Sequence, residues 1–291
     1  MTVTWSGCGL GTAPMGSRPD GPLRWGTQDD SVSVRTIHAA LDAGVTWIDT
    51  APFYGWGHAE SVVGRALRGR QRDSVVVLTK CGTVQRGDGW ADDGSPAAMR
   101  ADLTASLGRL GLDHVDVLQL HDPDPAVPVE ETVGAMAELV ASGLVGAIGL
   151  SNHPVDLLDR AHAVASIGVV QHQWSLLSRD AEAAAARHWA AAHGARFLAW
   201  SPLASGWLTT GFDPDALDPD DLRRRLPWAD HPEVARLRQI AASLGRPLEE
   251  LAVGWALRGG HAIVGARSPA EIPLLSTDPL DDETAAPLVS A

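Results

Sequence analysis

The chain has few cysteines and no long apolar run. Cys8 and Cys81 are its only cysteines in 291 residues and lack the CxxC spacing of a metal or redox site, which excludes a disulfide framework. The longest apolar runs, such as residues 75–78, fall far short of the roughly 20 residues that cross a bilayer. The amino terminus also lacks the pattern of a secretory signal. We therefore expect a cytoplasmic protein without a membrane span.

Positive charge is scarce as well. The chain has 23 Lys and Arg against 36 Asp and Glu, for a formal net charge of −13, and no Lys/Arg-rich block opposes this excess. Such a surface repels nucleic-acid phosphates and anionic lipid headgroups. We therefore expect neither nucleic-acid nor membrane partners, and expect a small-molecule substrate instead.

Lysine and tyrosine each occur only once. Lys80 is the single lysine among 23 basic residues, and Tyr54 is the single tyrosine beside 11 tryptophans and three phenylalanines. Because Arg and Trp otherwise fill these roles, a specific requirement for an ammonium and a phenol is expected at these two positions.

Short apolar runs typical of β-strands recur about every 30 residues, with helical patterns between them. Residues 8–13 form the first run, and the others end at Asp49, Lys80, His121, Ser151, Gln171, Trp200 and Gly265. Continuous apolar strands that alternate with helices indicate a parallel sheet buried on both faces. No GxGxxG turn of a doubly wound sheet is present. The sequence predicts an α/β fold, a (β/α)8 TIM barrel that forms one domain over residues 1–291.

Helix signals support the same alternation. A Ser at position 31 predicts a helix cap before residues 31–43, and Pro128 and Gly143 bracket a helix over 129–142. Further helices are predicted over residues 181–192, 231–244 and 247–257. The acidic, proline-containing stretch 212–221 predicts an irregular surface loop.

Chemistry is expected where the barrel strands end, because the loops there form the active site of such barrels. Asp49, Lys80 and His121 close three strands, and Tyr54 follows Asp49 by five residues. A phenol of pKa about 10 is a poor acid near neutrality, but a nearby ammonium lowers that pKa, and a carboxylate holds the ammonium. These groups can protonate an alkoxide but cannot supply a hydride, so the set predicts a reduced nicotinamide cofactor.

Seven segments carry these residues in order: GLGTAPMG, WIDTAPFYG, VVLTKCG, LQLHDPD, IGLSN, WSPLASG and VGARSP. With them the chain resembles an aldo-keto reductase over essentially its whole length. The resemblance implies NAD(P)H-dependent reduction of an aldehyde or ketone, or the reverse oxidation of a sugar or alcohol. It makes Tyr54 the general acid/base, with Asp49, Lys80 and His121 completing a tetrad.

The resemblance also implies a cofactor site at the barrel mouth. Ser151, Asn152 and Gln171 would hold the nicotinamide carboxamide, Trp200 would stack on its ring, and residues 201–206 would wrap the pyrophosphate. The full expected set is Gly11, Thr12, Ser151, Asn152, Gln171, Trp200, Ser201, Pro202, Leu203, Ser205, Gly206, Gly265, Arg267, Ser268 and Glu271.

The adenosine end of this site carries opposed signals. Arg267 and Ser268 are suitable donors for a 2′-phosphate, whereas Glu271 would repel that phosphate and suits a free 2′-hydroxyl. Since a charge-assisted contact outweighs a screened repulsion, NADP is the expected cofactor, with NAD also accepted.

Aromatic residues define the expected substrate side. Trp25, Phe53, Trp56 and Trp90, with Trp174 and Trp207 as further candidates, fall in segments near the mouth. Their rings suit a sugar, an aryl ketone or a polycyclic carbonyl compound.

Two other functions compete with a reductase. One is a cofactor-binding regulatory barrel with little turnover, which an intact tetrad disfavours. The other is a metal-dependent hydrolase that uses Asp49, His121 and Asp122, but the chain lacks an HxH or HExxH pattern, so no metal is expected. A single strand-end His or Asp is most often structural, and Trp200 could simply pack at the rim, so the weight rests on the four residues together.

Overall fold

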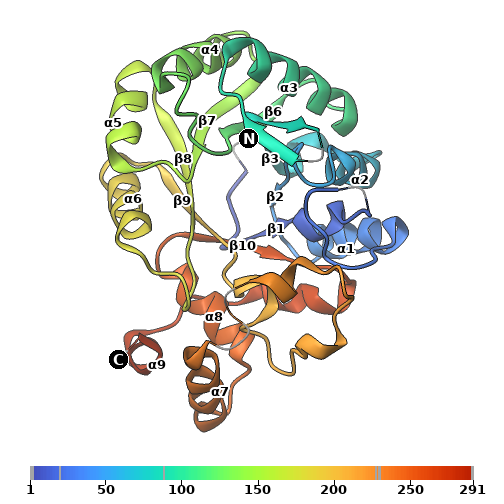
Figure 1. Ribbon diagram of the computed structural model, residues 1–291, viewed down its shortest axis with the longest axis vertical. Coiled ribbons are helices and arrows are strands. Elements are labelled where there is room, and N and C mark those ends of the chain that lie inside the picture. Colours follow the sequence, from blue (N-terminus) through green and yellow to red (C-terminus); the bar gives the residue numbers. More distant parts are fainter. Residues whose placement is uncertain (1–2, 20, 88, 227, 229–230, 290–291) are drawn as a thin grey trace.

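Eight parallel strands close into a barrel in the computed structural model, which describes residues 3–19, 21–87, 89–226, 228 and 231–289 (Figure 1). Around the barrel the strand order is β1-β10-β9-β8-β7-β6-β3-β2. The strands are β1 (Cys8–Gly11), β2 (Trp47–Asp49), β3 (Val76–Cys81), β6 (Val115–Leu120), β7 (Val145–Ser151), β8 (Ile167–Gln173), β9 (Arg196–Trp200) and β10 (His261–Gly265). The (β/α)8 barrel predicted from the sequence is confirmed.

Helices ring the barrel, while α7 and α9 lie outside that ring (Figure 1). The helices are α1 (Asp30–Asp42), α2 (His58–Leu67), α3 (Pro96–Leu110), α4 (Val129–Ala141), α5 (Val155–Val164), α6 (Ala181–Ala192), α7 (Pro232–Leu244), α8 (Leu248–Leu257) and α9 (Asp282–Val289). The five predicted helices are confirmed to within a residue at each end. The cap of α1 differs, because the Asp29 side chain, rather than Ser31, accepts hydrogen bonds from the first backbone amides.

The inward face of the barrel changes from apolar to polar along its axis. Every second side chain along each strand points into the barrel. Together these side chains form the interior cluster, which includes Trp47, Leu78 and Val117. Two residues further along the same strands stand Asp49, Lys80 and Gln119, all buried. The strand alternation therefore delivers polar side chains to the carboxyl-terminal mouth and leaves apolar ones below.

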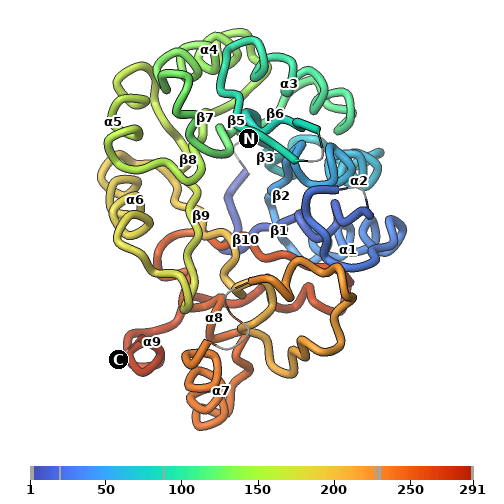
Figure 2. The backbone as a smooth tube through the Cα atoms, viewed as in Figure 1, coloured from blue at the N-terminus to red at the C-terminus, as the bar shows by residue number. Residues whose placement is uncertain are grey.

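Trp47 fills the opposite end of the barrel. Its ring lies 5.2 Å from that of Trp5, and its indole N–H donates to the Ser6 backbone oxygen at 2.9 Å. A Cβ on Gly9 would lie 2.2 Å from the Trp47 ring, so only glycine leaves room for it there. The N-terminal segment thus runs across the centre of the barrel, as Figure 2 shows.

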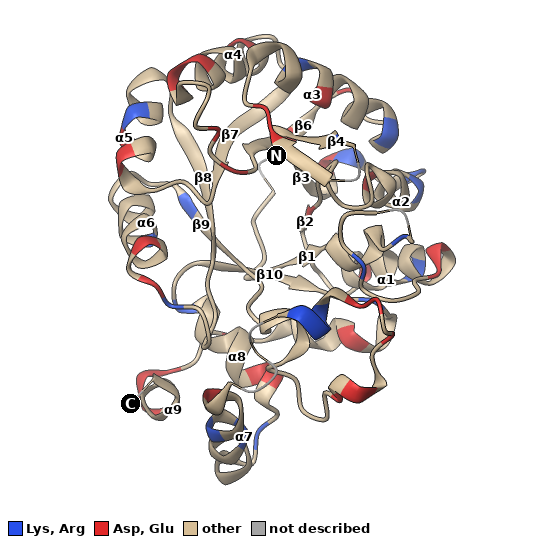
Figure 3. Ribbon diagram, in the orientation of Figure 1, with Lys and Arg blue, Asp and Glu red and all other residues tan. Residues whose placement is uncertain are grey.

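Insertions shape the mouth. An antiparallel hairpin of β4 (Thr83–Arg86) and β5 (Gly89–Asp92) follows β3, and the sequence patterns do not reveal it. Residues 212–221 are irregular as predicted, apart from the short turn Pro214–Ala216. Charged residues lie mainly on the helices and loops around the barrel (Figure 3).

No helix in the described part of the chain is both long enough and apolar enough to span a membrane.

Candidate active site

Lys80 lies between Asp49 and Tyr54 at the mouth of the barrel. Its ammonium donates to Asp49 Oδ1 at 2.7 Å, to the Thr50 backbone oxygen at 3.1 Å and to the Tyr54 hydroxyl at 3.3 Å. Lys80 and Asp49 are each 1% exposed. The structure therefore brings together three of the four predicted catalytic residues through direct hydrogen bonds.

These contacts keep Lys80 charged. Burial by itself disfavours an ammonium, but the attraction of Asp49 and the hydrogen bonds to Asp49 and Tyr54 outweigh it and raise the pKa of Lys80. A fixed positive charge therefore lies against the Tyr54 hydroxyl at neutral pH.

The pKa of Tyr54 differs from the sequence-based prediction. Lys80 lowers this pKa as expected, but desolvation of the hydroxyl is the larger effect, and the negative charges of Asp49 and Asp122 add to it. The net pKa is raised above the usual 10.0, so Tyr54 is a protonated phenol across the neutral range. The predicted lowering by Lys80 is therefore present, but burial, which the sequence reasoning left out, outweighs it.

His121, the fourth predicted residue, faces Tyr54 across the mouth. Their rings are 6.1 Å apart and nearly perpendicular, at 85°. Burial and the positive charge of Lys80 lower the pKa of His121 well below 6.5, so its imidazole is neutral at pH 7. A neutral ring can donate one hydrogen bond to a carbonyl oxygen placed beside the Tyr54 hydroxyl.

Asp49 has two further partners that the sequence reasoning does not supply in this role. The amide nitrogens of Gln119 and Gln171 each donate to Asp49 Oδ2 at 3.1 Å. The sequence predicts Gln171 only at the cofactor, and Gln119 is absent from the predicted set. Its place on β6 two residues after the inward-facing Val117, and two residues before His121, is the signal that could have identified it.

Asn152 links Asp122, the residue after His121, to Trp200. Its side-chain amide donates to Asp122 Oδ1 at 2.8 Å, and its Oδ1 accepts the Trp200 indole N–H at 3.0 Å. Its backbone is left-handed, with φ of 60°. Ser151, the preceding residue, is buried at the end of β7. The residues predicted to hold the nicotinamide thus lie together beside the tetrad.

The segment after β9 has an unusual backbone. Ser201, Ala204 and Ser205 all have positive φ, of 57°, 46° and 60°, and Gly206 follows at 98°. Left-handed non-glycine residues are uncommon and cluster at ligand-binding sites. Pro202 and Leu203, also expected at the cofactor, lie within this segment.

Three predicted cofactor residues pack closely against the rest of the protein. Thr12 is fully buried, and both its backbone N–H and its hydroxyl donate to the Asp49 backbone oxygen at 3.0 Å. A Cβ on Gly11 would lie 2.7 Å from the Ile263 side chain, and a Cβ on the exposed Gly265 would lie 3.3 Å from the Pro14 ring. Thr12 therefore anchors the strand that carries Asp49.

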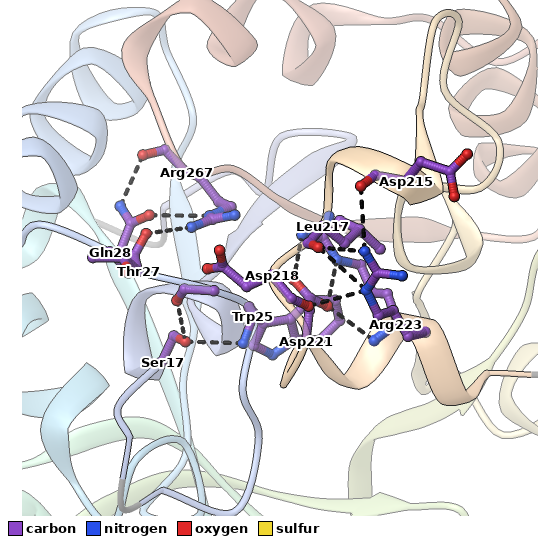
Figure 4. A network of polar contacts seen from close by, with 12 residues as sticks. Ser17, Trp25, Thr27, Gln28, Asp215, Leu217, Asp218, Asp221, Arg223 and Arg267 are labelled. Carbon is purple, nitrogen blue, oxygen red and sulfur yellow. Dashed lines mark hydrogen bonds and ion pairs between the residues drawn. The ribbon is translucent and has the colours of Figure 1, made fainter.

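Arg267 and Glu271 are already engaged. The Arg267 guanidinium donates to the Thr27 backbone oxygen at 2.6 Å and to Gln28 Oε1 at 3.0 Å, within the network of Figure 4. Glu271 accepts the Arg267 backbone N–H at 3.2 Å and the Ser268 hydroxyl at 2.8 Å. The Ser268 hydroxyl, expected to face a phosphate, therefore binds the protein's own carboxylate, and the Arg267 guanidinium binds Thr27 and Gln28.

Three of the four predicted substrate residues form one aromatic cluster. The Phe53 ring lies 5.6 Å from Trp56, 5.2 Å from Trp90 and 5.7 Å from His121. Trp90, on the hairpin, is 54% exposed. Trp25 lies apart, with the Arg223 guanidinium 5.9 Å from its ring. Trp174 and Trp207, the further candidates from the sequence, are buried in the hydrophobic core.

Within the residues that the structure describes, no group of three or more His, Cys, Asp or Glu side chains is arranged to hold a metal ion.

Comparison with known proteins identifies the family. A model described as the aldo/keto reductase family matches residues 8–275. The chain is 34% identical over 281 residues to aldo-keto reductase YhdN of Bacillus subtilis (strain 168), covering 92% of this chain and 83% of that one. It is 30% identical over 296 residues to the NADH-specific methylglyoxal reductase of Escherichia coli (strain K12), covering 93% and 88%.

A solved structure agrees over nearly the full length. The glycerol dehydrogenase AKR11B4 from Gluconobacter oxydans superposes with a TM-score of 0.86 at 32% identity, covering 99% of this chain and 91% of that one. The chain therefore belongs to the aldo-keto reductase family of oxidoreductases, which act on carbonyl and alcohol groups.

Proposed function

We propose that this chain is a cytoplasmic, single-domain, nicotinamide-dependent carbonyl reductase in which Tyr54 is the general acid. The observation that carries the proposal is the buried Lys80 ammonium, 2.7 Å from Asp49 and 3.3 Å from the Tyr54 hydroxyl. A reduced nicotinamide supplies the hydride when it is bound, and the protein supplies the proton.

Tyr54 suits the acid role because its hydroxyl lies against the Lys80 ammonium. A group that must give up a proton has to hold it first, and the phenol is protonated at neutral pH. As negative charge develops on the substrate oxygen, the Lys80 ammonium stabilises the phenolate that remains after proton transfer. His121, neutral and across the mouth, orients the carbonyl oxygen toward the phenol.

The residues beside the tetrad fit a nicotinamide. The Gln171 amide nitrogen is committed to Asp49, which leaves its carbonyl oxygen to accept from a carboxamide. Ser151 and Asn152 stand at the same edge, and the indole of Trp200 is fixed by its bond to Asn152. The left-handed turn over residues 201–206 provides a backbone shape suited to wrapping a phosphate-containing group.

The mouth also suggests the kind of substrate. Phe53 lies beside His121, and Trp56 and Trp90 pack against Phe53. Asp92 and Asp122 lie in the same region, and desolvation raises the pKa of both. Aromatic faces next to carboxylates favour neutral carbonyl compounds, including hydroxylated ones such as sugars, over anionic ones.

The contacts of Glu271 shift the cofactor preference toward NADH. A 2′-phosphate carries nearly two negative charges and would have to displace the carboxylate that already holds the Ser268 hydroxyl and the Arg267 N–H. A free ribose 2′-hydroxyl can instead donate to that carboxylate. The E. coli relative whose name is NADH-specific lends the same preference support.

Removal of the Glu271 charge tests this preference. We expect Glu271→Gln and Glu271→Ala to raise kcat/KM with NADPH by about tenfold while changing the NADH value less than about threefold. The gain stays modest because Glu271 is exposed and solvent screens its charge. Steady-state kinetics with both cofactors measures it.

Glu138→Gln is the matched control. Glu138 is an exposed glutamate that pairs with Arg100, and its helix α4 lies across the barrel from β10 (Figure 1). It should leave the NADPH to NADH ratio unchanged. An equal response of both cofactors to Glu271→Gln, or none, would contradict the assignment of preference to this carboxylate.

Turnover of the wild-type protein tests the function itself. We expect NADH oxidation, followed at 340 nm, with at least one member of a panel of methylglyoxal, aryl ketones and free sugars. A chelator should not affect the rate. Cofactor binding without turnover across the panel would support the regulatory barrel, and chelator-sensitive hydrolysis without NADH would support the hydrolase.

A further inference from the structure

The Asp49 carboxylate is held by three donors. Oδ1 accepts from Lys80, and Oδ2 accepts from Gln119 and Gln171. Asp49, Lys80, Gln119 and Gln171 are all 2% exposed or less. Because all four side chains are buried, the direction of Oδ1, and hence the place of the Lys80 ammonium, depends on the groups that bind Oδ2.

Gln119 has one possible amide orientation here. A carboxylate only accepts hydrogen bonds, so the amide nitrogen must face Asp49 and the carbonyl oxygen must point away. That oxygen is buried and has no partner among the described residues. An unpaired buried carbonyl costs free energy, so this amide is a poor choice for simple filling of the barrel.

Gly149 makes space for Gln119. The two residues are register partners on β7 and β6, and a Cβ on Gly149 would lie 2.6 Å from Gln119 Cγ. No real Cβ tolerates that distance, so the inward course of the Gln119 side chain depends on a glycine in the neighbouring strand.

We propose that Gln119 is a positioning residue, which acts through Asp49 to place the Lys80 ammonium against the Tyr54 hydroxyl. This inference rests on the proposed function. The resemblance gives Gln171 a second partner in the cofactor, whereas among the described residues the Gln119 side chain hydrogen-bonds to Asp49 alone. Gln119 is thus the donor that holds Oδ2 independently of the cofactor.

The Lys80 contacts show which interaction depends most on this placement. Its distance to Tyr54, 3.3 Å, is longer than those to Asp49 and Thr50, at 2.7 and 3.1 Å. If Asp49 turns, the ammonium follows its strongest partner, and the contact with the phenol is the first to weaken.

Gln119→Leu removes the donor and keeps a similar volume. We expect kcat to fall about tenfold, while KM for NADH and for the carbonyl substrate change less than about twofold, because no ligand contact is lost. Thermal unfolding by circular dichroism and NADH titration by fluorescence show whether the variant is folded and binds cofactor. A kcat within twofold of wild type would overturn the inference.

Gln119→Glu distinguishes positioning from packing by pH. The charged and titratable groups around Asp49 are Lys80, Tyr54, His121 and Asp122. A second carboxyl group beside Asp49 shares a proton with it, and its protonated form can donate to Oδ2 as the amide does. This variant should approach wild-type kcat at low pH and fall to the level of Gln119→Leu as pH rises. A profile parallel to that of the wild type would contradict the proposal.

Gly149→Ala displaces the Gln119 side chain without changing Gln119 itself, because the new Cβ on β7 would lie 2.6 Å from Gln119 Cγ. This variant should lower kcat as Gln119→Ala does, and adding it to Gln119→Ala, which has no Cγ, should cost less than about twofold more. Independent effects of the two changes would overturn the link. Inactivity of the wild-type protein with every carbonyl would overturn the proposed function and this inference with it, whereas an active wild type with unaffected variants overturns the inference alone.

Discussion

Tyr54→Phe should lower kcat for carbonyl reduction by at least about 100-fold and leave the affinity for NADH nearly unchanged. The variant loses one hydroxyl group, which is the acid next to Lys80. The ring remains, so its contact with His121 and the shape of the mouth should persist. Single-turnover kinetics and a fluorescence titration with NADH separate the loss of chemistry from any loss of binding.

The pH dependence of the wild type adds to this test. Because the pKa of Tyr54 is raised above 10.0 and that of His121 is lowered well below 6.5, neither group changes charge near pH 7. We expect kcat for reduction to be flat through neutrality and to fall only at strongly alkaline pH, where the phenol loses its proton.

Ser106→Ala is the control for Tyr54→Phe. It removes a buried hydroxyl on α3, and its kcat should stay within about twofold of wild type. Turnover of Tyr54→Phe at a similar rate would remove the role assigned to the phenol.

Lys80→Met should reduce kcat by at least about 100-fold and also destabilise the fold. Asp49 would lose its ion pair at a site without solvent, and breaking one partner of a buried pair costs about 3–5 kcal/mol. The pKa of Tyr54 should rise further, since Lys80 is the group that lowers it, and the alkaline limit of reduction should move upward.

A double variant separates the two effects of Lys80. Lys80→Met combined with Asp49→Asn removes both charges, so the free energy of unfolding should recover while kcat stays low. Lys80→Arg retains the charge on a broader, planar head and should also lose activity at this fully packed position. Full turnover in Lys80→Arg would show that compact ammonium geometry is not required, and an unchanged profile in Lys80→Met would make Lys80 structural.

Periodicity and strand ends predict much of this molecule. The eight apolar runs identify the barrel strands, and because parallel strands end at one mouth, the amino-acid order alone is enough to place Asp49, Lys80 and His121 together. Because Phe53 directly precedes Tyr54, the sequence also predicts that an aromatic ring lies beside the catalytic residues.

The features that escape the sequence depend on contacts between distant segments. The bond from Gln119 to Asp49 joins residues 70 positions apart, and its existence depends on the register of β6 and on Gly149 in the next strand. The raised pKa of Tyr54 depends on desolvation, which residue identity alone does not express. The bond from Ser268 to Glu271 is an exception, because it joins residues only three positions apart at the start of the turn after β10.

The most direct test of the central claim is the fate of deuterium from NADH labelled at both C4 positions, with methylglyoxal or another carbonyl compound that the wild-type protein reduces. We predict an alcohol with one deuterium on its carbinol carbon, formed in equal amount to the NADH oxidised, with or without a chelator. Alcohol without deuterium, or oxidised NADH without alcohol, would contradict a reductase in which the nicotinamide supplies the hydride and Tyr54 the proton.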